Sequence, residues 1–252
     1  MSNFVSTNSV VRKIWGRADV VLFIFAGSAA EFALNKAVDW LYFTGKLPAD
    51  PLGRLFSTVA YARRIIFADL DEAHRAIDQI TAIHQGVEQS RGAKIPDWAY
   101  RDVLFMLIDY SIRSFELLDR KLTDAEKQEV FDVFYRVGAR MQLQGLPQNY
   151  QEWVGMRQGH LDNDLICSDF TADLYRQYRK HLGGLRYFVM KQVQQMLLAP
   201  RVRQLLGMGR VVILKPVLLV YRLFRSLRWE RPFKNALLPQ KYKAQILALD
   251  AA

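Results

Sequence analysis

The sequence has little cysteine and lacks the motifs of several large enzyme classes. Its 252 residues contain one cysteine, Cys167, so no disulfide can form within the chain, which fits a reducing compartment. The sequence has no H-E-x-x-H or other zinc-type cluster, and no E-x-x-H pair of a di-iron site. A glycine-rich phosphate loop, a nucleophile elbow and internal repeats are also missing. Cys167 has no local partner for nucleophilic catalysis and is interpreted as a structural thiol.

Long apolar runs are absent as well. The longest, Val20 to Ala30, is bounded by Asp19 and Glu31 and is about half as long as a helix that crosses a bilayer. We expect a buried helix here that continues to about Trp40. The first residues have no basic region leading into an apolar core, so no signal peptide is predicted and a cytoplasmic protein is expected.

The remaining pattern is helical. With 51% hydrophobic residues the chain can bury its own core, and at this length one domain over residues 1–252 is expected. Apolar residues at helical spacing predict an all-α fold, with helices over about 71–89 and 97–118. Thr123 and Glu126 form a capping box that begins another helix.

Three positions on these helices carry candidate chemistry. His84 lies at the edge of the apolar stripe of the 71–89 helix, either as a core imidazole bonded to a carbonyl or as a metal ligand. Arg54 and Thr58 are one turn apart on a preceding helix and could bind an anionic group together; alternatively, Arg54 is a surface arginine and the threonine bonds back to the backbone. Asp109 is either a pocket acid or half of a structural pair with Arg113, four residues further on.

Three short motifs, in order and at similar intervals, resemble those of the latex clearing protein and MpaB-like oxygenase family. They are V-R-K-I-W-G-R at 11–17, D-P-L-G-R-L-F-S-T at 50–58 and I-H-Q-G-V at 83–87. Weaker matches extend the resemblance over nearly the whole chain, at 122–126, 145–147, 152–153 and 237–239. The resemblance implies an all-α, multi-helix bundle that encloses a b-type haem pocket.

The resemblance also assigns roles to residues. It makes His84 the axial ligand of the haem b iron, from an I-H-x-x-V segment, and Arg54 and Thr58 pocket residues from an R-x-x-x-T pair. Two positions depart from the family pattern. Asp109 stands where members often have a second histidine, and Ser57 stands where rubber-cleaving members have a lysine. These departures concern the substrate more than haem binding.

The positive charge is concentrated in residues 201–243. This segment has eleven lysines and arginines and one acid, Glu230, a balance of +10 that equals the net charge of the chain. Residues 211–227 combine aliphatic and basic side chains, which is typical of a helix lying on an anionic membrane surface, or of a solvated helix face. Nucleic-acid binding is disfavoured because no helix-turn-helix or zinc finger accompanies the basic residues.

The leading hypothesis is a haem-dependent dioxygenase, with Arg54, Thr58 and Asp109 as candidate catalytic residues and His84 as the metal ligand. The family precedent implies dioxygen and an apolar isoprenoid, polyprenyl or lipid-like substrate whose carbon–carbon double bond is cleaved. One alternative is a non-catalytic helical protein that binds haem or a lipid and docks on membranes or a partner. Another is a haem-free basic interaction domain.

Overall fold

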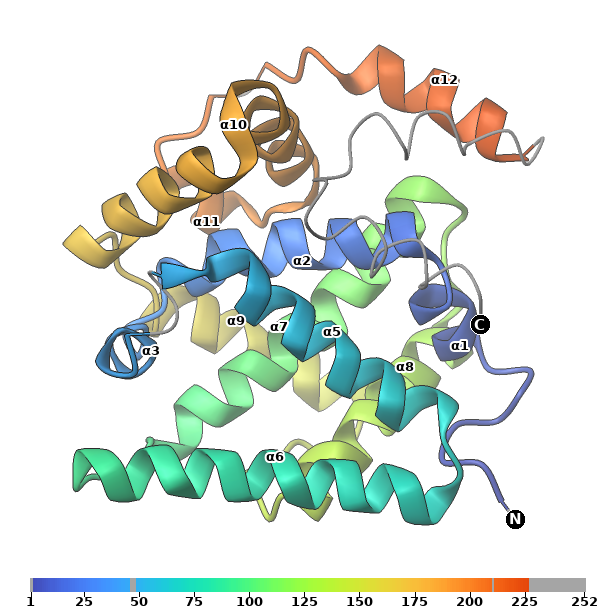
Figure 1. The fold of residues 1–252 in the computed structure, drawn as a ribbon. Helices are drawn as coiled ribbons and strands as arrows, with labels where there is room; N and C mark the ends of the chain where they lie inside the picture. Colours follow the sequence, from blue (N-terminus) through green and yellow to red (C-terminus); the bar gives the residue numbers. More distant parts are fainter. Residues whose placement is uncertain (1, 46–48, 210, 227–252) are drawn as a thin grey trace.

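The computed structural model describes residues 2–45, 49–209 and 211–226, and within these ranges the regular structure is helical (Figure 1). The all-α prediction is confirmed. Two isolated bridges, Asn3 with Asp69 and Asn35 with Leu165, are the β pairing in this part of the chain. The helices are α1 (Val10–Trp15), α2 (Ala18–Phe32), α3 (Asp39–Phe43), α5 (Pro51–Phe67), α6 (Leu70–Arg91), α7 (Asp97–Leu118), α8 (Asp124–Arg140), α9 (Tyr150–Asn163), α10 (Asp169–Leu197), α11 (Pro200–Leu205) and α12 (Lys215–Ser226).

Helices α2 and α7 form the centre of the core. They pack closely because Gly27 of α2 faces the ring of Tyr110, and a Cβ atom at Gly27 would lie 2.3 Å from that ring. Trp15 of α1 is fully buried beside them and donates a hydrogen bond from its indole nitrogen to Ser111 Oγ at 3.1 Å. The core is therefore assembled around the helix that the sequence predicted over residues 97–118, and α7 has those bounds.

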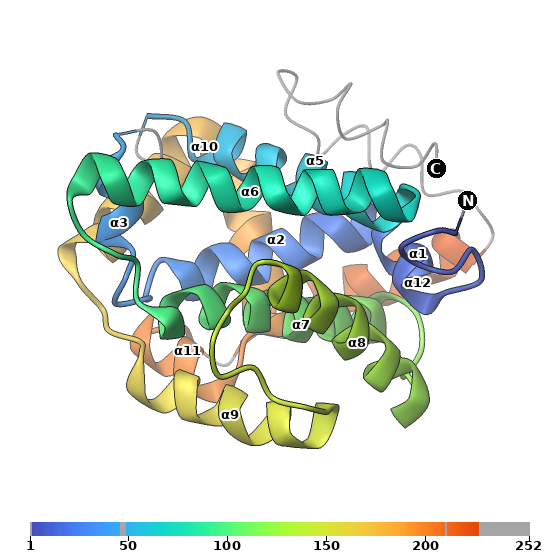
Figure 2. The ribbon, with the colours of Figure 1, turned by 90° about the horizontal axis from the view of Figure 1, so that it is seen from below.

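Helices α5 and α6 form an antiparallel pair on one side of the molecule. In Figure 1 α6 lies along the lower edge, and in Figure 2 it runs in front of α5. Asp50 caps α5 by accepting a hydrogen bond from the Gly53 amide, and Asp69 caps α6 by accepting one from the Glu72 amide. Helix α6 ends at Arg91, and its C-cap residue Gly92 has a positive φ of 69°, which suits a residue without Cβ.

The first apolar helix is shorter than predicted. Helix α2 ends at Phe32, and α3 begins only at Asp39, so the expectation of one helix to about Trp40 is wrong. The chain turns because the backbone between the helices bonds to the segment after α9: the Lys36 amide donates to the Asp164 carbonyl, and the Ile166 amide donates to the Leu34 carbonyl. These tertiary bonds replace the helical ones.

The last described helices lie on the side of the molecule opposite α6 (Figure 1). Helix α10 bends at Gly183, whose φ of 72° and ψ of 171° are not helical. Helix α12 begins at Lys215, and the rest of the predicted basic segment, residues 227–243, lies outside the described residues. None of the described helices has both the length and the apolar character of a membrane span.

Candidate functional site

His84 lies on α6, half-buried, and its ring orientation is fixed by the backbone. Its Nδ1 is 2.9 Å from the carbonyl oxygen of Ile80, one turn earlier. A carbonyl oxygen only accepts hydrogen bonds, so Nδ1 carries the proton and Nε2 keeps its lone pair. Burial lowers the pKa of His84, and the positive charge of Arg54 lowers it too, so the ring stays neutral at physiological pH. A neutral imidazole with a free Nε2 is the form that binds iron.

Arg54 on α5 lies close enough to His84 for its charge to affect the ring. The guanidinium is partly buried, and burial lowers its pKa. Within the described residues no carboxylate forms an ion pair with it, whereas the two buried arginines, Arg157 and Arg225, both pair with carboxylates. A desolvated arginine without an anion is unfavourable on its own, so this site is suited to an anionic group supplied by a ligand.

Thr58 lies one turn after Arg54, and its hydroxyl bonds back to the helix. Its Oγ1 donates to the Arg54 carbonyl oxygen at 3.2 Å, and Ser57 Oγ donates to the same oxygen at 2.8 Å. This is the backbone bond that the sequence left open as an alternative. The oxygen of Thr58 retains lone pairs that could accept a hydrogen bond, but its proton is used within α5.

Two residues that sequence reasoning missed complete the surroundings of His84. The ring of Tyr100, at the start of α7, packs edge-on against the imidazole with 5.3 Å between centroids. The Tyr100 hydroxyl donates to Glu88 Oε1 at 3.1 Å, and the Ile95 amide donates to the same oxygen at 2.9 Å. Glu88 is four residues after His84, a spacing that could have indicated proximity, whereas Tyr100 reaches the site only through the turn between helices.

Asp109 does not share the surroundings of His84 but belongs to a buried charge network. Its Oδ1 accepts a hydrogen bond from Arg113 Nε at 2.6 Å, which is the structural pair considered from the sequence. Its Oδ2 accepts one from Arg157 Nη2 of α9 at 3.1 Å. Arg157 also binds Glu31 of α2 with both terminal nitrogens, at 2.5 and 2.6 Å. These contacts link α2, α7 and α9 and use both oxygens of Asp109.

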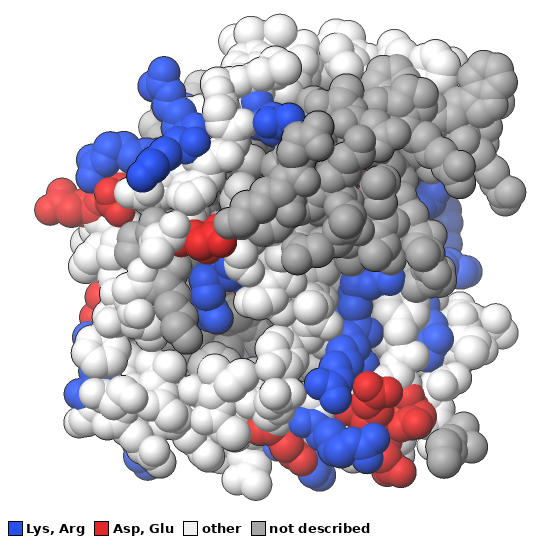
Figure 3. Space-filling model, in the orientation of Figure 1, with Lys and Arg blue, Asp and Glu red and all other residues white. Residues whose placement is uncertain are grey.

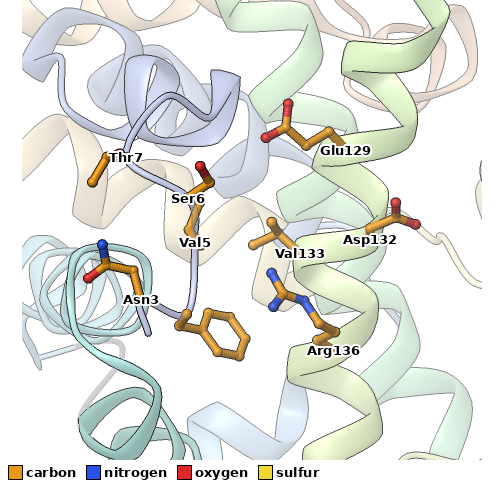
Figure 4. A pocket seen from close by; sticks show the side chains of 9 residues that line it. Asn3, Val5, Ser6, Thr7, Glu129, Asp132, Val133 and Arg136 are labelled. Carbon is orange, nitrogen blue, oxygen red and sulfur yellow. The ribbon is translucent and has the colours of Figure 1, made fainter. Parts of the chain in front are cut away.

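The described hollows lie away from these candidate residues. The larger, of about 580 Å³, lies between the N-terminal segment and α8, and Figure 4 shows Glu129, Asp132 and Arg136 on its α8 wall. A smaller one of about 260 Å³ lies at the bend of α10. Neither is lined by His84, Arg54, Thr58 or Asp109.

The donor set near His84 suits a porphyrin iron better than a bare ion. In the described part of the chain, no three His, Cys, Asp or Glu side chains gather so as to hold a metal. One neutral histidine suffices for haem, because the porphyrin supplies four other nitrogens and its propionates would supply the anion that Arg54 lacks. The residues at this position therefore fit the group that the sequence resemblance implies.

The fold and this arrangement are those of an all-helical domain with one candidate metal-binding histidine. Comparison with known families gives a match over residues 12–229 to the family described as ER-bound oxygenase mpaB/B'/Rubber oxygenase, catalytic domain. The chain belongs to this family of oxygenase catalytic domains, and the resemblance drawn from the sequence is confirmed. No match was found among curated proteins or among solved structures.

Proposed function

We propose that this protein is a b-type haem-dependent oxygenase with His84 as the axial iron ligand. The observation that carries the proposal is the proximity of two groups: a neutral His84, whose Nδ1 donates a hydrogen bond to the Ile80 carbonyl, and the guanidinium of Arg54, which pairs with no carboxylate among the described residues. The first presents a lone pair on Nε2, and the second presents a positive charge. Membership of an oxygenase family supports the same reading.

Each residue would have a definite task. His84 Nε2 would bind the iron, and the Ile80 carbonyl would increase the basicity of the ring by accepting a hydrogen bond from Nδ1–H. Arg54 would bind a propionate or orient bound dioxygen, with Thr58 beside it as an acceptor. Tyr100, held by Glu88, would limit rotation of the imidazole. The haem, when bound, would supply the activation of dioxygen.

The proposed substrates are dioxygen and an apolar isoprenoid, polyprenyl or other lipid-like chain. Cleavage of its carbon–carbon double bond would place one atom of dioxygen on each former alkene carbon. The products would be two carbonyl groups, so the four electrons lost by the alkene would reduce dioxygen completely and no other reductant would be needed. Peripheral contact with an anionic membrane, where such a substrate dissolves, is part of the proposal. We also propose that residues 1–252 form a single functional domain and that the protein is cytoplasmic.

A second candidate function is haem or lipid binding without turnover. It is favoured by two observations. The Thr58 hydroxyl donates its hydrogen bond to the Arg54 carbonyl within α5, and both carboxylate oxygens of Asp109 accept hydrogen bonds from arginines. In that case His84 would still bind haem, and Arg54 its propionate. Asp109 would then serve the stability of the bundle and not the chemistry.

Product analysis separates the two functions. The haem-loaded protein is incubated with a polyprenyl substrate under ¹⁸O₂, and the mass of the products is measured. An oxygenase gives shortened chains with ¹⁸O in both new carbonyl groups, whereas a carrier gives none. Arg54→Met should reduce product formation at least about tenfold, because it removes a charge-assisted contact. The matched control is Arg64→Met, since Arg64 is an exposed arginine on the same helix that pairs with Glu72, and it should retain activity.

A further inference from the structure

Helix α12 is attached to the protein by its polar side chains. Tyr221 donates a hydrogen bond from its hydroxyl to Asp19 Oδ2 of α2 at 2.9 Å. Arg225 lies 2.8 Å from the same carboxylate through Nε, and its Nη1 donates to the Leu118 carbonyl at 2.6 Å. The side chain of Arg225 is 4% exposed, so this basic residue of the C-terminal segment is part of the interior. Leu218 of the same helix is 8% exposed and belongs to the hydrophobic core, so α12 turns both polar and apolar side chains toward the protein.

The opposite face of α12, and the residues just before it, are apolar and exposed. We call this set the outer face; each member is at least 50% exposed: Val211, Ile213, Val217, Leu219 and Val220. In an ordinary surface helix the apolar stripe faces the core and the polar residues face water. Here Leu218 faces the core, but five more aliphatic side chains remain exposed within ten residues of sequence. Such a cluster on a surface marks contact with an apolar phase or a partner.

The charge around the outer face points to an anionic partner. Within the described residues from 211 to 226 there are three basic side chains, Lys215, Arg222 and Arg225, and no acid. Arg225 is neutralised inside the protein by Asp19 and Asp119, while Lys215 and Arg222 are exposed. Cations beside aliphatic side chains match a bilayer surface with anionic headgroups above acyl chains. The helix, with 12 residues, is too short to cross that bilayer.

The surface along α6 has a different character. On the face shown in Figure 3, acidic and basic side chains lie next to one another along the lower edge, where α6 is found. Pairs such as Arg140 with Asp78, at 2.7 Å, neutralise one another there. The outer face of α12 thus differs from the α6 side in having basic charge without acids, and apolar side chains beside it.

We propose that the outer face of α12 docks on the surface of an anionic bilayer, with the helix lying along the membrane and Val211, Ile213, Leu219 and Val220 entering the headgroup region. Polar anchoring by Tyr221 and Arg225 keeps the helix on the protein while its aliphatic side chains enter the lipid. The docking surface lies on the opposite side of the molecule from α6 (Figure 1), so it does not depend on His84. Membrane contact and haem binding can therefore fail separately.

Vesicle flotation of the full chain tests this proposal. The protein is mixed with vesicles of phosphatidylcholine alone, or with about 30% phosphatidylserine, and the bound fraction is measured. We expect binding to the anionic vesicles and at least about tenfold weaker binding in the double variant Leu219→Ser, Val220→Ser, because two aliphatic side chains no longer enter the lipid. Lys215→Gln should weaken binding to anionic vesicles only. The matched control is Val154→Ser, Ile166→Ser, which alters two exposed aliphatic residues elsewhere and should float like the unaltered protein.

A local probe separates docking through α12 from attachment by another surface. In a Cys167→Ser background, Leu219→Cys or Val154→Cys is labelled with an environment-sensitive fluorophore. Docking through α12 predicts a blue-shifted, stronger emission from position 219 with anionic vesicles and no change from position 154. The proposal is overturned if flotation is absent, if it is unaffected by the double variant, if neutral vesicles bind equally well, or if position 154 responds and position 219 does not.

Discussion

Arg157 holds three helices together through buried carboxylates, and its replacement should be among the most destabilising changes in this protein. Its side chain is 5% exposed and the Glu31 side chain is fully buried. Arg157→Met leaves Glu31 with the hydroxyl of Tyr110 as its one remaining side-chain partner, at 2.7 Å, and deprives Asp109 of one of its two arginines. Two carboxylates then remain in the interior with too little positive charge near them.

The expected size of the effect follows from this geometry. Removing one member of a buried ion pair costs about 3–5 kcal/mol, because the other charge stays desolvated. With a urea m value of about 3 kcal/mol/M, a loss of about 4 kcal/mol lowers the unfolding midpoint by about 1.3 M. Urea unfolding followed by circular dichroism at 222 nm measures this shift. The matched control is Arg140→Met, since Arg140 forms an exposed pair with Asp78, and its midpoint should not change measurably.

A double-mutant cycle tests whether the network is the cause. Glu31→Gln removes the main carboxylate partner of Arg157, so the effects of Glu31→Gln and Arg157→Met should not add. If Arg157→Met shifts the midpoint no further than Arg140→Met does, the buried network does not stabilise the fold. Strict additivity of the two changes would also contradict the reasoning, because it would mean that the side chains act independently.

Two further predictions concern α7. Burial, with the charge of Glu31, raises the pKa of Asp102 to about 8, so the folded protein holds a proton that the unfolded chain has lost. The free energy of unfolding should therefore fall as pH rises from about 4 to 8. Urea midpoints measured across this range should fall less steeply in Asp102→Asn. The same slope in both proteins would contradict this prediction. Gly27→Ala should destabilise by about 1–3 kcal/mol because the new methyl group meets the Tyr110 ring. Gly155→Ala, at an open helical position, should instead stabilise slightly in the same thermal melts, and equal effects would refute the packing argument.

Local features of the fold could be predicted from the sequence. The apolar spacing gave α7 its bounds, and the Thr123–Glu126 capping box begins α8 as expected. The ion pair of Asp109 with Arg113 followed from their four-residue spacing on one helix. Such features depend on residues within a few turns of one another, and their geometry is set by the helix itself.

Long-range pairing could not be predicted in the same way. Glu31 lies at the end of the apolar run of the first long helix, where a charged residue is expected to face solvent. In the structure its side chain is buried and forms an ion pair with Arg157, 126 positions later. Arg225 belongs to a basic segment that favoured a membrane or solvent face, yet it pairs with Asp19 inside the protein. Helical periodicity contains no information about which distant charge will neutralise another.

In the candidate site, too, local spacing could be predicted from the sequence, whereas contacts between helices could not. Sequence spacing placed Arg54 and Thr58 on one face of α5, and the structure brings Arg54 near His84. The contact of Tyr100 with the imidazole depends on how α7 begins after the turn that ends α6, and no periodicity indicates it. The hydrogen-bond partner of the Thr58 hydroxyl could not be predicted from the sequence either, because a threonine hydroxyl in a helix can donate to the backbone or to a neighbouring side chain.

Iron binding by His84 is the claim on which the proposed function depends, and the visible absorption spectrum of protein expressed with excess haem tests it most directly. The account predicts a Soret band with about one haem per chain, lost in His84→Ala and restored when imidazole is added to that variant. His74→Ala, which changes another histidine of α6, should keep the band. A colourless wild-type protein, or a Soret band that is unchanged in His84→Ala, would contradict the account.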